Sequence, residues 1–207
     1  MGQDRDRLAP WSGAVFVVLV IAGGVMAGNT PGAKATGAKV LSFYLSHHAK
    51  SQAAAVLLTL AFVALVLFAA ALRTYFRRAG ADGLAAALLA GAAILATGQT
   101  INVSFTWALA KNAKTLSPTA AQVLNVAQND VVLASAAGWF IFSSVAWLTI
   151  MRTRALPIWV GWVSLVIAVV VLTPLELIGF LLFVIWVAVA TVLTARRWPP
   201  PVSTGRS

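Results

Sequence analysis

The two histidines and two of the five acidic residues of this 207-residue chain are candidates for acid–base or metal chemistry. His47 and His48 are adjacent, whereas Asp130 and Glu176 lie far from them and from each other in the sequence. Imidazole and carboxylate groups form mixed metal sites, and three such groups around one pocket would suit an enzyme. Adjacent histidines on a helix point in different directions, however, and the separations follow no metal-binding spacing. The pattern therefore favours surface solvation and helix capping, with a site as the alternative.

A second candidate is a polar stripe in an otherwise apolar segment. Gln99, Asn102 and Thr106 are three and four residues apart, so they share one face of a helix. Beside hydrocarbon these side chains need partners, and we expect the stripe to point into a helix bundle. Hydrogen bonds between helices are the favoured interpretation, and a polar vestibule open to the outside is the alternative. The predicted ligand-binding set is thus this stripe with the two histidines and two carboxylates, and no catalytic residue, metal site or cofactor is assigned.

The composition of the chain indicates the environment in which these candidate residues are held. Apolar residues make up 60% of the chain, charged residues only 10%, and the mean hydropathy is +0.90. A soluble domain carries about 25% charged residues, so much of this chain must face lipid. The net charge is +10, and the basic residues that produce it are scattered between apolar runs. This distribution is typical of the flanks of membrane segments and not of nucleic-acid binding. The composition also excludes a soluble enzyme, and the absence of cysteine excludes a disulfide scaffold.

The apolar segments predict an all-α polytopic membrane protein with a six-transmembrane-helix bundle. A bilayer core of about 30 Å needs about 20 apolar helical residues. The last apolar region is nearly twice that length, and Pro174 and Glu176 near its middle predict a hairpin turn that divides it. One integral domain, 1–197, is expected, followed by a disordered cytoplasmic tail, 198–207. The predicted helices cover about 13–28, 53–72, 84–107, 131–151, 158–173 and 177–195.

The first apolar segment has a second interpretation. Arg5 and Arg7 precede it, and Ala27-Gly28 ends it, as in a signal peptide with a small-residue cleavage site. Asp4 and Asp6 dilute the positive charge and the small-residue match is weak. A retained first helix is therefore favoured over cleavage.

The distribution of lysine and arginine predicts orientation. With the N-terminus inside, the inner segments carry ten arginines and the outer segments carry five lysines. The excess of cations marks the cytoplasmic side, so both termini are predicted to be cytoplasmic. The outer lysines are Lys34, Lys39, Lys50, Lys111 and Lys114, and the inner arginines are Arg5, Arg7, Arg73, Arg77, Arg78, Arg152, Arg154, Arg196, Arg197 and Arg206.

Each of the two long outer loops is expected to contain an interfacial helix. Thr36 is a predicted cap for the first, and Ser117-Pro118 begins the second. The first has an apolar stripe of Val40, Leu41, Tyr44 and Leu45; the second has Ala120, Leu124, Ala127 and Val131 on one face and Gln122, Asn125 and Asn129 on another. Small-residue pairs in the membrane segments, Gly24-x-x-x-Gly28 and Ala87-x-x-x-Gly91 among them, predict close helix approach.

Two stretches carry a family resemblance. Residues 37–48, GAKVLSFYLSHH, resemble the first outer loop of uncharacterised multi-pass proteins from high-GC Gram-positive bacteria. Residues 155–162, ALPIWVGW, are similar to the entry into the penultimate helix of that family. His48 stands where the family pattern has Arg or Gly. The resemblance implies six helices and a bacterial plasma-membrane location, and it implies no catalytic residue because the family is a domain of unknown function.

These observations predict a non-enzymatic integral membrane protein: a small-ligand or lipid binding or permeation module, or an accessory subunit of a membrane complex. Its expected partners are membrane lipids and either other membrane subunits or a second copy, without nucleic acid. The alternative is a membrane-embedded enzyme acting on lipid or envelope substrates from the outer face. A permeation role requires the polar stripe to line a cavity, and an accessory role requires an exposed small-residue face.

Overall fold

The computed structural model describes residues 9–198, and within that range the chain is helical with no strand. Two helices begin where the sequence supplies a cap: the Thr36 and Ser117 side chains each accept a hydrogen bond from a first-turn amide, and Pro118 opens the second of these helices. The segments are η1 (Ala9–Trp11), α2 (Ser12–Ala27), α3 (Gly37–Ser46), α4 (His48–Arg78), α5 (Asp82–Asn112), α6 (Pro118–Asp130), α7 (Val132–Thr153), α8 (Ile158–Val170) and α9 (Glu176–Arg196).

Within the described residues, five helical stretches are long and apolar enough to cross a membrane, and the described chain is all-helical. They are Ala9–Ala27, His48–Arg78, Asp82–Asn112, Pro118–Thr153 and Glu176–Arg196. The predicted division of the last apolar region is present, because α8 ends at Val170 and α9 begins at Glu176. However, α8 has only 13 residues, which cover about 20 Å of a core about 30 Å thick. The sixth predicted span is therefore not established by helix length.

Six helices, α2, α4, α5, α7, α8 and α9, form what we call the bundle. Each packs against the next in the order α2, α4, α5, α7, α8, α9, and contact between α9 and α2 closes the ring. Aromatic rings fill the centre, where Phe16 contacts Phe62 and Phe183. Phe183 also packs edge-on against Phe142 and lies close to Trp139. A continuous core of aromatic and aliphatic side chains thus fills the bundle.

Glycines bring α5 and α7 into backbone contact. A Cβ on Gly98 would lie 2.8 Å from the backbone nitrogen of Ser135, and a Cβ on Gly138 would collide with the Leu95 backbone. Gly91, from a predicted small-residue pair, has the same role against Phe142. Gly24, from another such pair, faces outward, since a Cβ added there would meet no atom within 4 Å. The small-residue pattern therefore predicts close packing correctly on α5 but not on α2.

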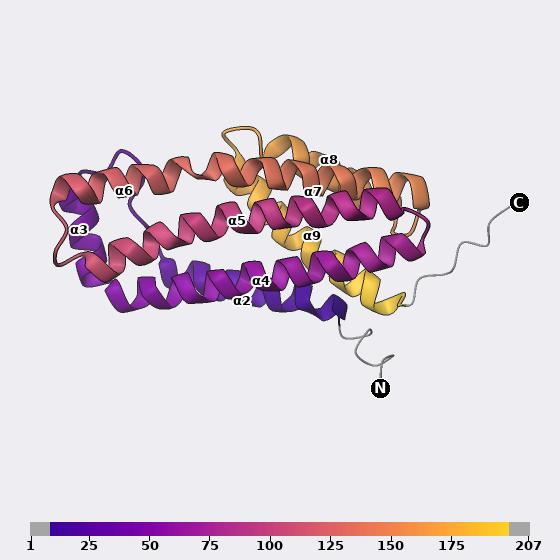
Figure 1. The fold of residues 1–207 in the computed structure, drawn as a ribbon, viewed down its shortest axis with the longest axis horizontal. Coiled ribbons are helices and arrows are strands. Elements are labelled where there is room, and N and C mark those ends of the chain that lie inside the picture. Colours follow the sequence, from indigo (N-terminus) through magenta and orange to yellow (C-terminus); the bar gives the residue numbers. More distant parts are fainter. Residues whose placement is uncertain (1–8, 199–207) are drawn as a thin grey trace, which may run out of the picture.

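The second part of the molecule, which we call the cap, contains α3, α6, the connection 28–36 and the adjoining ends of α4 and α5. Figure 1 shows that α4 and α5 run the full length of the molecule, whereas the α8–α9 turn reaches only about halfway along it. Helix α6 continues the line of α7, and α3 lies across the far end and packs against α6. The cap has its own apolar core: Val40, Tyr44, Leu109, Ala110, Ala113 and Ala121.

Two expectations concern the cap. The predicted helices of the two outer loops exist, and they pack on each other and on α5. In addition, α4 and α5 each have 31 residues, more than the predicted 53–72 and 84–107. Helix α5 continues to Asn112 beside the cap core, whereas α4 is longer at both ends, from His48 to Arg78.

Both described ends of the chain lie at the same end of the molecule, opposite the cap (Figure 1). Ala9, Ser12 and Trp198 line one hollow of about 390 Å³. Trp198 belonged to the predicted disordered tail, but its ring stacks on Tyr75 at 6.0 Å and the Arg78 guanidinium lies 5.2 Å from its centroid. That part of the prediction is wrong, and residues 199–207 lie outside the described range.

Candidate functional site

The two histidines and two carboxylates are not brought together. His47 and His48 lie at the junction of α3 and α4, Asp130 ends α6 and Glu176 begins α9; all four are exposed. The His47 ring stacks on Phe43 and its Nδ1 lies 2.8 Å from the Ser46 hydroxyl. Within residues 9–198, no three histidine or acidic side chains lie close enough together to hold a metal ion. The enzyme alternative required such a convergence, so this set does not support it.

The polar stripe on α5 points toward α6 and α7. The Gln99 amide donates to the Ser135 hydroxyl at 3.0 Å, and the Asn102 amide donates to the Gln128 backbone oxygen at 2.7 Å. Thr106, which is 8% exposed, accepts from the Gln128 side chain at 2.9 Å. Each member of the stripe therefore uses its polar atoms to join helices. This arrangement matches the hydrogen-bonding interpretation, because each of the three side chains already bonds a group on another helix.

The sequence analysis missed the partners that complete this network. Tyr44 of α3 donates to Gln128 Oε1 at 3.4 Å, and Gln128 in turn donates to Thr106, so one amide joins α3, α6 and α5. Asn125, which is 1% exposed, donates to the Gly32 backbone oxygen at 3.0 Å and ties the 28–36 connection to α6. We call these bonds and those of the α5 stripe the polar network. Its members lie where the cap meets the bundle.

Burial in the cap changes the acidity of Tyr44. Desolvation raises the pKa of its phenol above 10.0, and hydrogen bonds with Thr106 and Gln128 oppose this with smaller effects. The side chain is fully buried between apolar neighbours, so the neutral phenol is the form that the folded cap accommodates. Tyr44 therefore acts as a hydrogen-bond donor here and not as a base.

A signal for the missed residues was present in the sequence. Ala121, Asn125 and Gln128 are four and three residues apart and share a face of α6, as Gln99, Asn102 and Thr106 do on α5. Our prediction placed Asn125 on a solvent-facing stripe with Gln122 and Asn129, but the structure buries Asn125 and exposes the other two. The matching polar faces of two neighbouring helices indicated a shared interface, because buried amides need partners.

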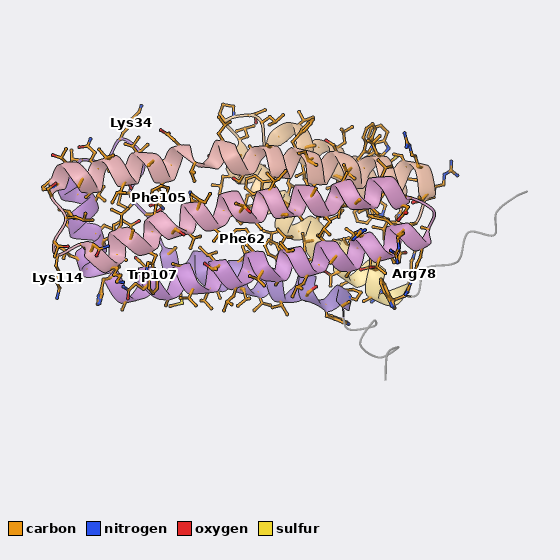
Figure 2. The ribbon with its side chains drawn as sticks, viewed as in Figure 1. Lys34, Phe62, Arg78, Phe105, Trp107 and Lys114 are labelled. Carbon is orange, nitrogen blue, oxygen red and sulfur yellow. The ribbon has the colours of Figure 1, made fainter. Side chains whose placement is uncertain are left out.

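A groove along the outside of the molecule is a candidate ligand site among the described residues. It follows the contact between α4 and α5 and consists of two hollows, of about 320 and 480 Å³, that share Ser104. We call it the α4–α5 groove. Its walls include Val56 and Leu60 near the cap and Leu67 and Ala93 further along. Figure 2 shows Trp107, which lines the end nearer the cap, beside the contact between these two helices.

Three of the hydroxyls in the groove are already paired. The Thr59, Thr100 and Ser104 hydroxyls each donate to the backbone oxygen four residues earlier in their own helix, at 2.7 to 2.9 Å. Because these hydroxyls have partners and most other lining side chains are aliphatic or aromatic, the groove offers a largely apolar surface. Such a surface suits a hydrocarbon chain better than a polar solute.

Fold and groove together define an all-helical membrane protein with a lateral apolar groove and a separately packed cap. No protein-family model, curated protein or solved structure matches the chain. Its function therefore has to be argued from the site itself.

Proposed function

We propose that the chain crosses a bacterial plasma membrane six times with both ends in the cytosol. The adjacency of Ala9 and Trp198 supports an even number of crossings. The described arginines lie at the ends of α4, α7 and α9 opposite the cap, and Figure 2 shows Lys34 and Lys114 at the cap end and Arg78 at the other. This separation supports a cytoplasmic arginine end and an external cap. The six helices implied by the family resemblance agree with this arrangement.

Helix α8 is shorter than the bilayer core, so a six-pass arrangement has to accommodate it. Its apolar residues continue past Val170 through a turn to Pro174, and exposed large side chains such as Trp162, Val166 and Leu172 suit lipid contact. A short hydrophobic segment is accommodated by local thinning of the bilayer at modest cost. The α8–α9 turn would then lie at the external surface of the plasma membrane, where Glu176 can reach water.

The absence of cysteine makes this topology directly testable. Single cysteines introduced as Lys114→Cys, Pro174→Cys and Arg154→Cys would be treated in intact cells with a thiol reagent that does not cross membranes. We expect labelling at 114 and 174, and labelling at 154 only after lysis. Labelling at 154 in intact cells, or protection at 174, would overturn the proposed arrangement.

Within that membrane protein, we propose a non-enzymatic function in which the α4–α5 groove binds a lipid acyl chain. The observation that carries the proposal is the groove itself, which is apolar, open to the side and continuous over two hollows. The polar network favours this function over permeation, because Gln99, Asn102 and Thr106 join helices instead of lining a path. Lipid binding is therefore preferred among the expected non-enzymatic roles.

A groove-blocking variant tests the proposal. Ser104→Phe places a ring where the two hollows meet, and Val18→Phe places the same ring on α2, where Val18 is 65% exposed. After mild detergent extraction, native mass spectrometry would count the lipids that remain bound. We expect wild-type protein and Val18→Phe to retain a lipid that Ser104→Phe loses. Equal retention by all three proteins, or no retained lipid in any, would refute acyl-chain binding in the groove.

An accessory-subunit role is the second candidate, and one observation favours it. Helix α5 exposes a row of small residues, Ala86, Ala90, Ala93 and Thr97, at spacings of three and four. Such faces allow close approach of another transmembrane helix. Ala90→Leu would disrupt that contact while leaving the groove lining intact, so loss of a co-purifying subunit in this variant alone would favour the accessory role.

A further inference from the structure

The end of the α4–α5 groove nearer the cap carries a cation. Ser104, Trp107 and Lys111 are three and four residues apart on α5, so Lys111 continues the groove face one turn beyond Trp107. Lys111 is exposed, α4 contains no acidic residue, and the acidic residue of α5 is Asp82 at its opposite end. The positive charge at this end of the groove is therefore not neutralised by either helix that forms it.

Helix α4 adds hydrogen-bonding groups opposite Lys111. His48 and Gln52 precede Thr59 by eleven and seven residues, which places them on the groove side of α4 beyond its apolar part. His48 is exposed and Gln52 is half-buried. An ammonium, an imidazole and an amide around one end of an apolar groove form a set that suits a phosphate group.

The length of the groove fits one leaflet of a bilayer. Its α4 wall extends over residues 55–67, which cover about 18 Å of helix. Half of a hydrocarbon core about 30 Å thick is about 15 Å. A tryptophan at the end of the apolar part, followed by a lysine, is also the order in which side chains meet the membrane interface. The length of the groove and its polar end thus match a single lipid that enters from the cap side.

We propose that the occupant of the α4–α5 groove is an anionic phospholipid of the outer leaflet, with its acyl chain along the groove and its phosphate on Lys111. This inference rests on the acyl-chain site proposed above. A second copy of the chain is a poorer occupant, because the predicted outer segments carry five lysines against Asp130 and Glu176 and would repel each other. An anionic headgroup instead complements that charge.

Quenching of Trp107 fluorescence tests both the acyl-chain site and the preference for an anionic headgroup. The protein would be reconstituted into equal mixtures of phosphatidylglycerol and phosphatidylcholine, with brominated acyl chains on one lipid at a time. The signal of Trp107 is the difference between wild-type protein and Trp107→Phe. We expect brominated phosphatidylglycerol to occupy the site about fivefold more than brominated phosphatidylcholine, the preference that one lysine near an anionic surface provides.

Two variants identify the cation. Lys111→Gln should abolish the preference for phosphatidylglycerol, whereas Lys114→Gln, which removes an exposed lysine beyond the end of α5, should preserve it. Equal quenching by both brominated lipids in the wild-type protein, or a preference unchanged in Lys111→Gln, would overturn the headgroup inference and leave the acyl-chain site standing. If neither brominated lipid quenches Trp107, the acyl-chain site is overturned as well.

Discussion

The bundle and the cap are packed by the same chain but under different physical conditions. The bundle is apolar in its interior and on its exterior. Phe68 is fully buried in its interior, while Val18 and Leu67 on its exterior are 65% and 58% exposed. The cap has an apolar interior around Val40 and an exterior of charged and polar residues such as Lys39. Burial from water stabilises the cap by about 25 cal/mol per Å² of apolar surface, but burial from lipid gives the bundle no such gain.

Polar side chains follow this division only in part. In the bundle, Ser164 and Thr191 donate to the backbone of their own helix. Two bundle bonds do join helices, from Gln99 to Ser135 and from Trp186 to the Val160 oxygen. In the cap, the hydrogen bonds of Tyr44 and of Gln128 connect different helices. The comparison teaches that the bundle depends on how closely its backbones approach, whereas the cap depends on apolar burial and on a few polar connections.

The largest effect is expected where the bundle backbones touch. In Gly138→Val the added side chain would collide with the Leu95 backbone, and a backbone cannot move aside as a side chain can. We expect a loss of stability above about 3 kcal/mol, the upper part of the range for overpacking, and little folded protein. Gly24→Val is the matched control, because nothing lies within 4 Å of that position. Thermal unfolding in detergent and gel filtration measure the difference, and a stable Gly138→Val protein would show that backbone approach does not hold the bundle.

The same substitution in the cap should have a local effect. In Gly37→Val the side chain would collide with the Pro118 carbonyl, where α3 meets α6. We expect α3 to separate from α6 while the bundle stays folded, because the two regions have separate cores. Hydrogen exchange would show lost protection in residues 37–46 and 118–130 only. Loss of protection throughout α7 would mean that the regions unfold together and would contradict the division.

Much of the bundle could be predicted from the sequence because hydrophobic length is a strong signal. The expected boundaries of α2, α7 and α9 agree with the structure to within two residues, and Pro174 divides the last region as expected. The outer turns of α4 and α5 were not predicted as helix. For α5 the stability of these turns comes from tertiary contacts of the cap, such as those of Leu109 with its neighbours in the cap core, which no local pattern reveals.

The site was only partly predictable for a related reason. The face shared by Gln99 and Thr106 follows from helical spacing alone. The burial of Asn125 does not, because its partner is the backbone oxygen of Gly32, 93 residues earlier in the chain. The groove also has no local signature: its residues on α4 and α5 are ordinary lipid-facing side chains, and only the packing of the two helices forms the hollows.

A smaller effect is expected from the polar network. Gln128→Ala removes the amide that bonds both Tyr44 and Thr106 and leaves these two buried hydroxyls only each other as partners. Two hydrogen bonds are lost, so we expect a cost of about 1–3 kcal/mol to cap closure. Gln99→Ala, which removes one bond to Ser135, should cost about 0.6 kcal/mol, the average for hydrogen bonds between transmembrane helices. Exposed Gln122→Ala is the control. Hydrogen exchange in the cap measures all three, and equal effects of Gln128→Ala and Gln99→Ala would remove the distinction between cap and bundle.

The smallest effect should come from alkaline pH acting on the cap alone. Because burial raises the pKa of Tyr44 above 10.0, the folded cap favours the protonated phenol. The resulting stabilisation is complete below pH 10 and is lost as the pH rises through the higher pKa of the folded cap. The chain has two tyrosines, so the ultraviolet absorbance of Tyr75→Phe follows the ionisation of Tyr44 alone. We expect that titration above pH 10 and, over the same range, faster hydrogen exchange in the cap than in the bundle. Titration at pH 10 or below would show that Tyr44 is open to water, and the cap would then lack the separate interior on which the comparison depends.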